Sequence, residues 1–214
     1  MAATGPARPH LMVATGNPRK VRQIAELAGD LAAVTPVPRG AAESLMNEPS
    51  EGSFQSIAEA KALAASRYLP GDTLVVATDG GLLIPALAGS WNPLRTHRFA
   101  GEEVPARERA ERLLSLAAAL RGDERRIGWR EAMAVARGGR LLATWVADSP
   151  PGVLATELAP AALSAGEEFW VPALWRCPDC GGKRLADLTP AERAARRDHW
   201  AQLGERLRAF LLER

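Results

Sequence analysis

The sequence predicts an α/β fold, and three observations support this prediction. Short apolar runs at residues 11–14 and 73–78 have the length and composition of buried strands. Apolar side chains with helical spacing follow the first run and precede the second. The pair Gly138-Gly139 separates two runs of small and β-branched residues, which is a hairpin signal. Strands that alternate with helices in this way are typical of an α/β sheet.

Size and charge limit the classes of protein that need considering. The chain has 214 residues, 47% of them hydrophobic, which suits one large domain or two lobes that share a core. Its 27 basic and 25 acidic residues leave a net charge of +2, too balanced to indicate nucleic acid or an anionic membrane as a partner. No apolar stretch reaches the roughly 18 residues of a membrane span, and no signal sequence is evident, so we expect a cytoplasmic protein.

The first helix is predicted directly after the strand at residues 11–14. Asn17 is a suitable N-cap, and Pro18 suits the first helical position. An apolar stripe with helical spacing follows: Val21, Ile24, Ala25 and Ala28. We then expect a loop rich in proline and glycine as far as Gly52.

A second helix is expected to begin after Ser53, which can cap it. Its inward stripe has helical spacing: Phe54, Ile57, Lys61, Ala64, Ala65 and Tyr68. The strand at residues 73–78 follows, and we expect it to end at Asp79-Gly80-Gly81.

The C-terminal half continues the alternation. Residues 105–120 form a third amphipathic pattern that stops near Gly122, and the hairpin comes next. After a connection rich in proline and alanine (residues 150–166), the segment "EFWVPALW" is interpreted as an edge strand or a rim loop, because Pro172 cannot donate to a sheet.

The last element is predicted from a capping box. Thr189 and Glu192 have the spacing of that motif, and they are expected to open one long helix that ends near Glu213.

Two lysines occupy positions where a positive charge is unfavourable unless an anion is bound nearby. Lys20 lies in the first turn of a helix, where the positive end of the helix dipole repels a cation. Free backbone N–H groups there, with the side chains of Thr15 and Asn17, would form a cradle for phosphate oxygens. Lys61 falls on the inward stripe of the second helix. The simpler alternatives are a solvated Lys20 and a Lys61 that extends to the rim of the core.

A carboxylate completes this pattern. Asp79 ends an apolar strand, and the two glycines after it allow close approach of a ligand or metal. Carboxylates beside phosphate-binding lysines commonly serve Mg²⁺, and Glu48 and Glu51 are the expected partners of Asp79. Asp79 could instead be a turn residue, and both glutamates could be solvated loop acids.

Five segments of the chain resemble the inosine triphosphate pyrophosphatase family in order and spacing: "TGNPRK", "NEPSEGSFQSIAEAKA", "VVATDGGLLIPALAG", "THRFAG" and "GKRLADLTPAER". The resemblance implies a long twisted mixed sheet with helices in two lobes around a central cleft, formed by residues 1–214 as a single two-lobed domain. It also implies a homodimer, Mg²⁺ as cofactor, and hydrolysis of deaminated purine nucleoside triphosphates to monophosphates and pyrophosphate.

The resemblance assigns roles to individual residues. Asp79 matches the residue that activates water and binds metal, and Glu48 and Glu51 match the metal-binding loop. The expected substrate-binding residues are Thr15, Asn17, Lys20, Lys61, Gly80, Arg98, Trp170, Lys183 and His199. Arg98 could instead form a structural ion pair, and His199 is interpreted first as a helix-surface residue. Among the six tryptophans, Trp170 alone has a positional reason to contact a base.

Several residues depart from the family pattern. Thr78 replaces a family aspartate, Gly80 replaces a serine, and Val171 stands in the base-binding loop where an aspartate is expected. Thr78 and Gly80 stand beside Asp79, so weaker metal binding is implied. Val171 concerns recognition of the base, as does the segment "RRDHW", which replaces the family motif that reads the base, whereas the phosphate-binding residues are kept. Altered base specificity is therefore expected. Two alternatives stay open: a nucleotide-binding protein without turnover, and a structural or partner-binding protein on the same scaffold.

The two cysteines form the motif C-P-D-C at Cys177 and Cys180. This spacing fits half of a zinc site shared across a dimer, a redox pair, or a plain turn with two free thiols. The sequence alone does not decide among them.

Overall fold

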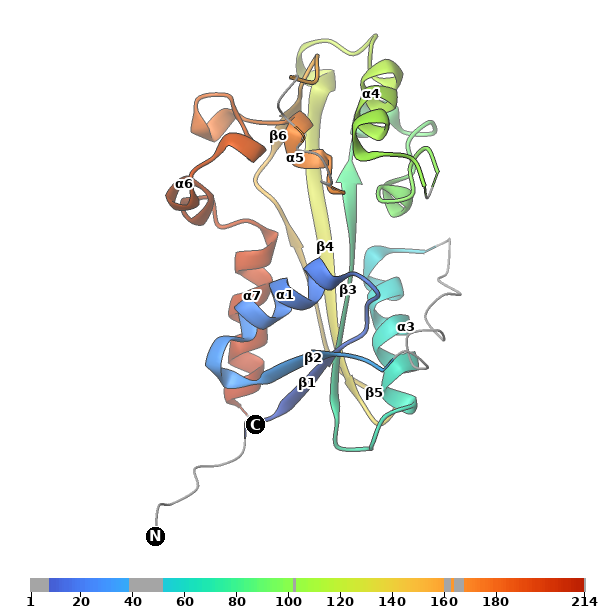
Figure 1. Cartoon of the computed structure of the whole chain (residues 1–214), viewed down its shortest axis with the longest axis vertical. Helices are drawn as coiled ribbons and strands as arrows, with labels where there is room; N and C mark the ends of the chain where they lie inside the picture. Colours follow the sequence, from blue (N-terminus) through green and yellow to red (C-terminus); the bar gives the residue numbers. More distant parts are fainter. Residues whose placement is uncertain (1–7, 39–51, 102, 160–162, 164–167, 214) are drawn as a thin grey trace. The chain divides into compact units, whose positions relative to one another are not determined.

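The computed structural model describes residues 8–38, 52–101, 103–159, 163 and 168–213 (Figure 1). The chain divides into two compact units. Unit 1 comprises Met1–Asp79, Glu131–Ala147 and Trp200–Arg214, and unit 2 comprises Gly80–Arg130 and Asp148–His199. Within the described ranges, no helix has the length and apolar character that crossing a membrane requires.

The strands form a mixed sheet. Their order is β2-β1-β3-β4-β6-β7-β8, and β5 pairs with β4 outside this path. β1 is parallel to β2 and β3, whereas β6 is antiparallel to β4 and β7. The α/β class and the mixed sheet expected from the sequence are therefore confirmed.

Unit 1 contains the N-terminal strand and helix pattern and the last helix. Its elements are β1 (His10–Val13), α1 (Pro18–Ala28), η1 (Gly29–Leu31), β2 (Ala33–Pro36), α3 (Phe54–Arg67), the first part of β3 (Leu74–Leu83) and most of α7 (His199–Leu212). It also holds the tip of the hairpin formed by β4 (Arg126–Arg137) and β5 (Arg140–Asp148).

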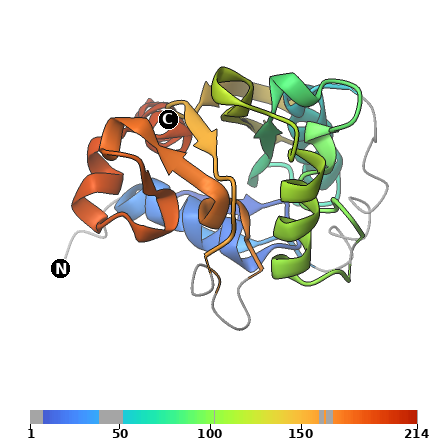
Figure 2. The same cartoon turned by 90° about the horizontal axis from the view of Figure 1, so that it is seen from above.

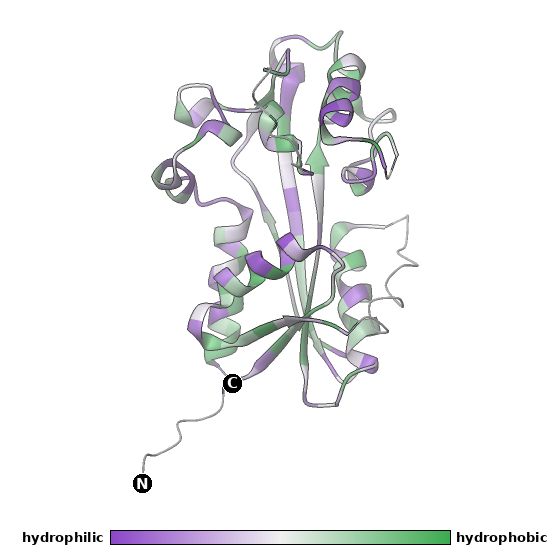
Figure 3. Cartoon of the chain, viewed as in Figure 1, coloured by the Kyte–Doolittle hydropathy of each residue, from purple (hydrophilic) through white to green (hydrophobic). Residues whose placement is uncertain are grey.

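The core of unit 1 lies where β1, α1 and α7 meet the strands. Ile24 of α1 and Leu203 and Leu207 of α7 are fully buried in it, together with Leu11 of β1. Burial of such side chains contributes roughly 1.5–3 kcal/mol each. The apolar colouring of these strands is visible in the lower part of Figure 3. The predicted apolar stripe of the first helix thus packs into this core, as expected.

Two helix starts confirm the sequence predictions. The side chain of Asn17 accepts a hydrogen bond from the backbone N–H of Arg19, and Pro18 is the first residue of α1. Ser53 caps α3 and exchanges hydrogen bonds with Ser56. Both caps occupy N–H groups that would otherwise lack partners.

Other predictions for unit 1 were wrong in detail. The expected loop before Gly52 contains β2, a short strand with mostly exposed side chains that gives little periodic signal. Tyr68 does not continue the buried stripe of α3, because the helix ends at Arg67 and the tyrosine is 67% exposed. The strand expected to end at Asp79 continues to Leu83, so Gly80 is in extended backbone inside β3.

The hairpin prediction is confirmed. β4 ends at Arg137 and β5 begins at Arg140, which leaves a turn of two residues. Both turn residues have positive φ, 55° at Gly138 and 74° at Gly139. This backbone matches the twist of the strands, and glycine adopts it without steric cost.

Unit 2 contains shorter elements. They are η2 (Pro85–Leu87), η3 (Pro93–Arg95), α4 (Ala106–Leu116), η4 (Gly122–Arg125), β6 (Gly152–Leu154), α5 (Val171–Leu174), β7 (Trp175–Cys177), η5 (Pro178–Cys180), β8 (Lys183–Arg184), η6 (Leu185–Asp187) and α6 (Pro190–Ala195). Figures 1 and 2 show α4 (green) and α6 (orange-red) on different sides of β4.

Three predictions for unit 2 need correction. The segment "EFWVPALW" forms the helical turn α5, in which Pro172 occupies an early helical position where its missing N–H has no cost. β6 was not expected in the proline-rich connection. The single C-terminal helix is interrupted: the capping box at Thr189 opens α6, but Arg197 has φ 45°, and α7 begins only at His199.

Gly152 is tightly packed, and this gives a testable expectation for stability. A Cβ atom at this position would lie 2.2 Å from Nε1 of Trp175, whose indole is 2% exposed. We expect Gly152→Ala to lower the free energy of unfolding by about 1–3 kcal/mol or more, because neither the strand nor the buried indole can move freely. Urea unfolding followed by circular dichroism measures this.

The matched control is Gly71→Ala, where an added Cβ atom meets nothing within 4 Å. Equal unfolding midpoints for the two variants would contradict the expectation for Gly152.

Candidate functional site

Lys61 and Asp79 form an ion pair in unit 1. The Nζ of Lys61 lies 2.8 Å from Oδ1 of Asp79, and the two side chains are 11% and 15% exposed. α3 supplies the lysine and β3 the aspartate. The positive charge of Lys61, on the inward stripe of α3, is therefore paired with a carboxylate of the protein itself.

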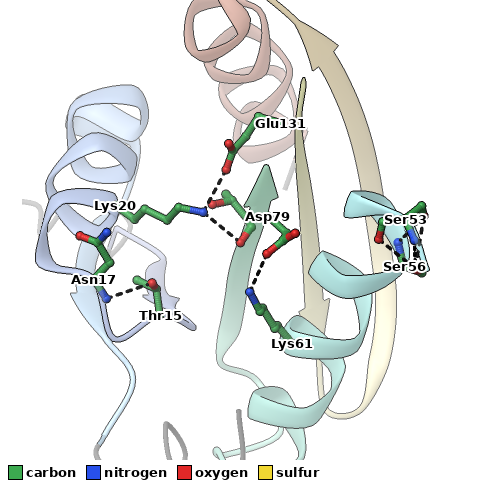
Figure 4. A network of polar contacts seen from close by, with 9 residues as sticks. Thr15, Asn17, Lys20, Ser53, Ser56, Lys61, Asp79 and Glu131 are labelled. Carbon is green, nitrogen blue, oxygen red and sulfur yellow. Dashed lines mark hydrogen bonds and ion pairs between the residues drawn. The ribbon is translucent and has the colours of Figure 1, made fainter. Parts of the chain in front are cut away.

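Lys20 reaches the same region from α1 (Figure 4). Its Nζ donates to the carbonyl oxygen of Thr78 at 3.3 Å and to Oε1 of Glu131 at 3.1 Å. Thr78 directly precedes Asp79 in β3, and Glu131 belongs to β4, the neighbouring strand. Figure 4 shows the two lysines approaching Asp79 from different helices.

The turn before α1 differs from the predicted phosphate cradle. The backbone N–H of Asn17 donates to Oγ1 of Thr15, and those of Lys20 and Val21 donate to the carbonyl oxygen of Asn17. The Asn17 side chain holds the N–H of Arg19. The prediction of free N–H groups at this helix start is thus wrong for these residues, because the cap uses them locally.

The surroundings of Asp79 act on its protonation in opposite directions. Burial raises the pKa of this carboxyl above its ordinary value, and the negative charge of Glu131 adds to the increase. The positive charges of Lys61 and Lys20, and the hydrogen bond from Lys61, lower it, but burial dominates. A carboxylate with a raised pKa accepts a proton more readily than a solvated one, which suits a general base.

Glu131 is a site residue that the sequence analysis missed. Its side chain is 1% exposed, although it is a carboxylate. A signal for it existed: Glu131 lies on the same side of β4 as Met133 and Val135, which are both fully buried. An acid at an inward position of a strand is the counterpart of Lys61 on the inward stripe of a helix.

The predicted metal ligands are only partly described. Glu48 and Glu51 lie outside the described residues. Within the part of the chain that the structure describes, no group of three or more His, Cys, Asp or Glu side chains is arranged to hold a metal. Asp79 and Glu131 supply two carboxylates from adjacent strands. This donor chemistry fits Mg²⁺, which commonly takes one or two protein carboxylates and completes its shell with water and phosphate oxygens.

Arg98 belongs to unit 2, in a turn held by α4. The guanidinium of Arg109, 6% exposed, donates to the carbonyl oxygens of His97 and Gly101, and Arg112 donates to that of Ala100 at 3.0 Å. The backbone of the turn is thereby fixed on both sides of Arg98, whose own side chain is exposed.

Lys183 and His199 are also in unit 2. Lys183 of β8 pairs with Glu192 of α6, and this hydrogen bond is the main cause that lowers the pKa of Glu192 to about 2. Binding of phosphate by Lys183 would have to use another of its three N–H donors or displace Glu192. The ring of His199 stacks on Trp129, with centroids 6.0 Å apart and an interplanar angle of 25°.

Trp170, the predicted stacking residue, lies in the core of unit 2. Its indole is 1% exposed and lies near Phe99, with ring centroids 6.4 Å apart. The base contact stays a prediction, and it requires that a face of this indole be uncovered.

The C-P-D-C motif forms the turn between β7 and β8 in unit 2. Both thiols are free; Cys177 is buried and Cys180 is half-buried. The guanidinium of Arg196 contacts the sulfur of Cys177 and pairs with Asp179 at 3.1 Å. Burial raises the pKa of the Cys177 thiol, which disfavours the reactive thiolate.

Solved structures similar to this one confirm the fold. A HAM1 protein from Coxiella burnetii is 22% identical, with a TM-score of 0.74 over 96% of this chain and 100% of the other. The Ham1 protein of Staphylococcus aureus is 21% identical, with a TM-score of 0.69 over 94% and 98%. A nucleoside-triphosphatase / dITP/XTP pyrophosphatase from Mycobacterium abscessus is 23% identical, with a TM-score of 0.66 over the same shares.

Curated proteins give no significant match to this chain. The family model of the Ham1 family, in contrast, matches residues 11–166. This match contains the elements that carry Lys20, Lys61, Asp79 and Glu131 and covers well over half of the sequence. The protein therefore belongs to the Ham1 family, the inosine triphosphate pyrophosphatase family that its motifs resemble.

Proposed function

We propose that this protein is a magnesium-dependent nucleoside triphosphate diphosphatase, which releases pyrophosphate and a nucleoside monophosphate. The observation that supports this most is the convergence of Lys20 and Lys61 at Asp79 within unit 1. Two cations and a buried carboxylate at one place suit a substrate with a polyphosphate chain and a water molecule to be activated. The similar Mycobacterium abscessus structure is of a dITP/XTP pyrophosphatase.

In the proposed mechanism, Asp79 orients and deprotonates the water that attacks the α-phosphorus. Its raised pKa makes it a better proton acceptor than a solvated aspartate. Lys20 and Lys61 donate to phosphate oxygens and neutralise the charge that accumulates on the leaving pyrophosphate. The role of Lys183 stays a prediction from the resemblance.

Magnesium would be held by Asp79, with Glu48 and Glu51 as the partners proposed from the sequence. When bound, it neutralises phosphate charge and makes the leaving group better. The residues on α1 and α3 then act as positioned donors around the polyphosphate.

We further propose that base specificity has changed relative to the family pattern. Val171 lacks the carboxylate that the base-binding loop of the pattern contains, and the segment "RRDHW" replaces the motif that reads the base. A site that offers few hydrogen bonds to the base edge discriminates weakly among bases. The homodimer stays a prediction from the resemblance.

The test is a panel of purine and pyrimidine ribo- and deoxyribonucleoside triphosphates, with pyrophosphate release measured in the presence of magnesium. We expect release from several members of the panel, including inosine and xanthosine triphosphate, and none after chelation of the metal. Thermal stabilisation by nucleotides without any release would instead identify a binding protein and would contradict the proposal.

A further inference from the structure

Glu131 carries a charge that the surrounding strand does not explain. The residues that follow it, from Ala132 to Ala136, are all fully buried, and Glu131 itself is 1% exposed. An isolated buried carboxylate is strongly unfavourable, so a partner is required. One such partner is Lys20, whose Nζ lies 3.1 Å from Oε1 of Glu131.

The contact also fixes the ammonium group of Lys20. An ammonium has three N–H donors, and two of them serve Glu131 and the carbonyl oxygen of Thr78. Among the residues that the structure describes, none takes the third. Lys20 is therefore held beside Asp79 with one donor left for a ligand oxygen.

Among these four described residues, the formal charges cancel. Lys20 and Lys61 contribute two positive charges, and ionised Asp79 and Glu131 contribute two negative ones. A metal-free polyphosphate would meet two lysines that are already paired and two carboxylates that repel it. A bound divalent cation would supply positive charge to Asp79 and Glu131 and would leave the two lysines to neutralise phosphate oxygens.

We infer that Glu131 makes this site select metal-complexed polyphosphate over metal-free polyphosphate, because it cancels the charge of Lys20 until a divalent cation arrives. The inference rests on the proposed function, since it assumes that unit 1 binds the polyphosphate part of the substrate. It assigns to Glu131 a role in substrate selection through Lys20, without contact between Glu131 and the phosphorus that reacts.

The test is calorimetric titration with inorganic tripolyphosphate, once with a chelator and once with magnesium. Glu131→Gln keeps the size of the side chain and its ability to accept a hydrogen bond from Lys20, but it removes the charge. We expect this variant to bind metal-free tripolyphosphate about tenfold more tightly than the wild type, because one positive charge is no longer cancelled. We expect the gain in affinity from magnesium to shrink by a similar factor.

The matched control is Glu26→Gln. Glu26 is on α1, the helix that carries Lys20, but its side chain is exposed. This variant changes the net charge of the protein equally, and it should bind like the wild type. Thermal unfolding checks each variant, and Glu131→Met provides a second neutral replacement if glutamine prevents folding.

The inference is overturned if neutral variants at position 131 bind metal-free tripolyphosphate no more tightly than the wild type. Weaker binding would show that Glu131 only holds Lys20 in place, which also overturns it. The inference is also overturned if the wild type binds no tripolyphosphate, either with the chelator or with magnesium. If tripolyphosphate binds as expected but no nucleotide releases pyrophosphate, only the proposed function is contradicted.

Discussion

Asp79→Asn is expected to lower magnesium-dependent pyrophosphate release by about three orders of magnitude, within the range assigned to general bases. Asparagine has nearly the same size, and its side-chain oxygen can still accept the hydrogen bond that Lys61 makes to Asp79 at 2.8 Å. It cannot take a proton from water, and it binds a divalent cation poorly. The effect should appear in kcat, because the variant lacks an interaction that matters most in the transition state.

The matched control for this variant is Asp72→Asn. Asp72 is exposed in the turn before β3, so its neutralisation should leave the rate unchanged. Binding of metal-free tripolyphosphate shows whether the lysines of Asp79→Asn remain in place. An Asp79→Asn protein that keeps more than a tenth of the wild-type rate would contradict the role of this carboxylate as a base.

Arg125→Met is expected to reduce the free energy of unfolding by about 3–5 kcal/mol, because several buried carbonyl oxygens lose their donor, and each unsatisfied buried group costs about 1–3 kcal/mol. The side chain is 6% exposed, and its guanidinium donates to four carbonyl oxygens. These belong to Ala117, Leu120, Leu154 and Ala155. Methionine fills similar space but leaves all four oxygens without this donor in a buried environment.

The neighbouring Arg126 gives a matched control. Its side chain is 69% exposed and pairs with Asp123 at 2.9 Å. Exposed pairs contribute little, so Arg126→Met should cost less than about 1 kcal/mol. Chemical denaturation measures both variants. A loss at Arg125 no larger than the loss at Arg126 would show that solvent reaches the carbonyl oxygens once the guanidinium is removed.

The elements that the sequence predicted correctly are those with local causes. Asn17 and Pro18 set the start of α1, Ser53 sets the start of α3, and Gly138-Gly139 sets the hairpin turn. Each depends on neighbours in the chain, whose chemistry is visible in the sequence.

The elements that were missed have causes distant in sequence. β2 exists because it pairs with β1 in parallel, although its own residues are mostly exposed. The strand through Asp79 continues despite two glycines. The helix break at Arg197 is not marked by a glycine or a proline, so the local sequence does not predict it.

The candidate site shows the same division. Lys61 could be predicted as a site residue because the pattern of its own helix favours an apolar residue at that position. Its ion pair with Asp79 agrees with the expectation that such a lysine has an anionic partner. Glu131 was overlooked because its partner is 111 positions away, on α1. The contact between Glu131 and Lys20 depends on β3 and β4 being neighbouring strands, which no local sequence pattern specifies.

The turn at Gly138-Gly139 has a consequence for engineering. The N–H of Gly139 donates to the hydroxyl of Ser66 near the end of α3 at 3.0 Å, so the hairpin that carries Glu131 is tied to the helix that carries Lys61. Short glycine turns between strands are commonly chosen for inserting an epitope or opening the chain to make a permutant. Here we expect an insertion to break the hydrogen bond that ties the hairpin to α3, so a tag is better placed at a terminus.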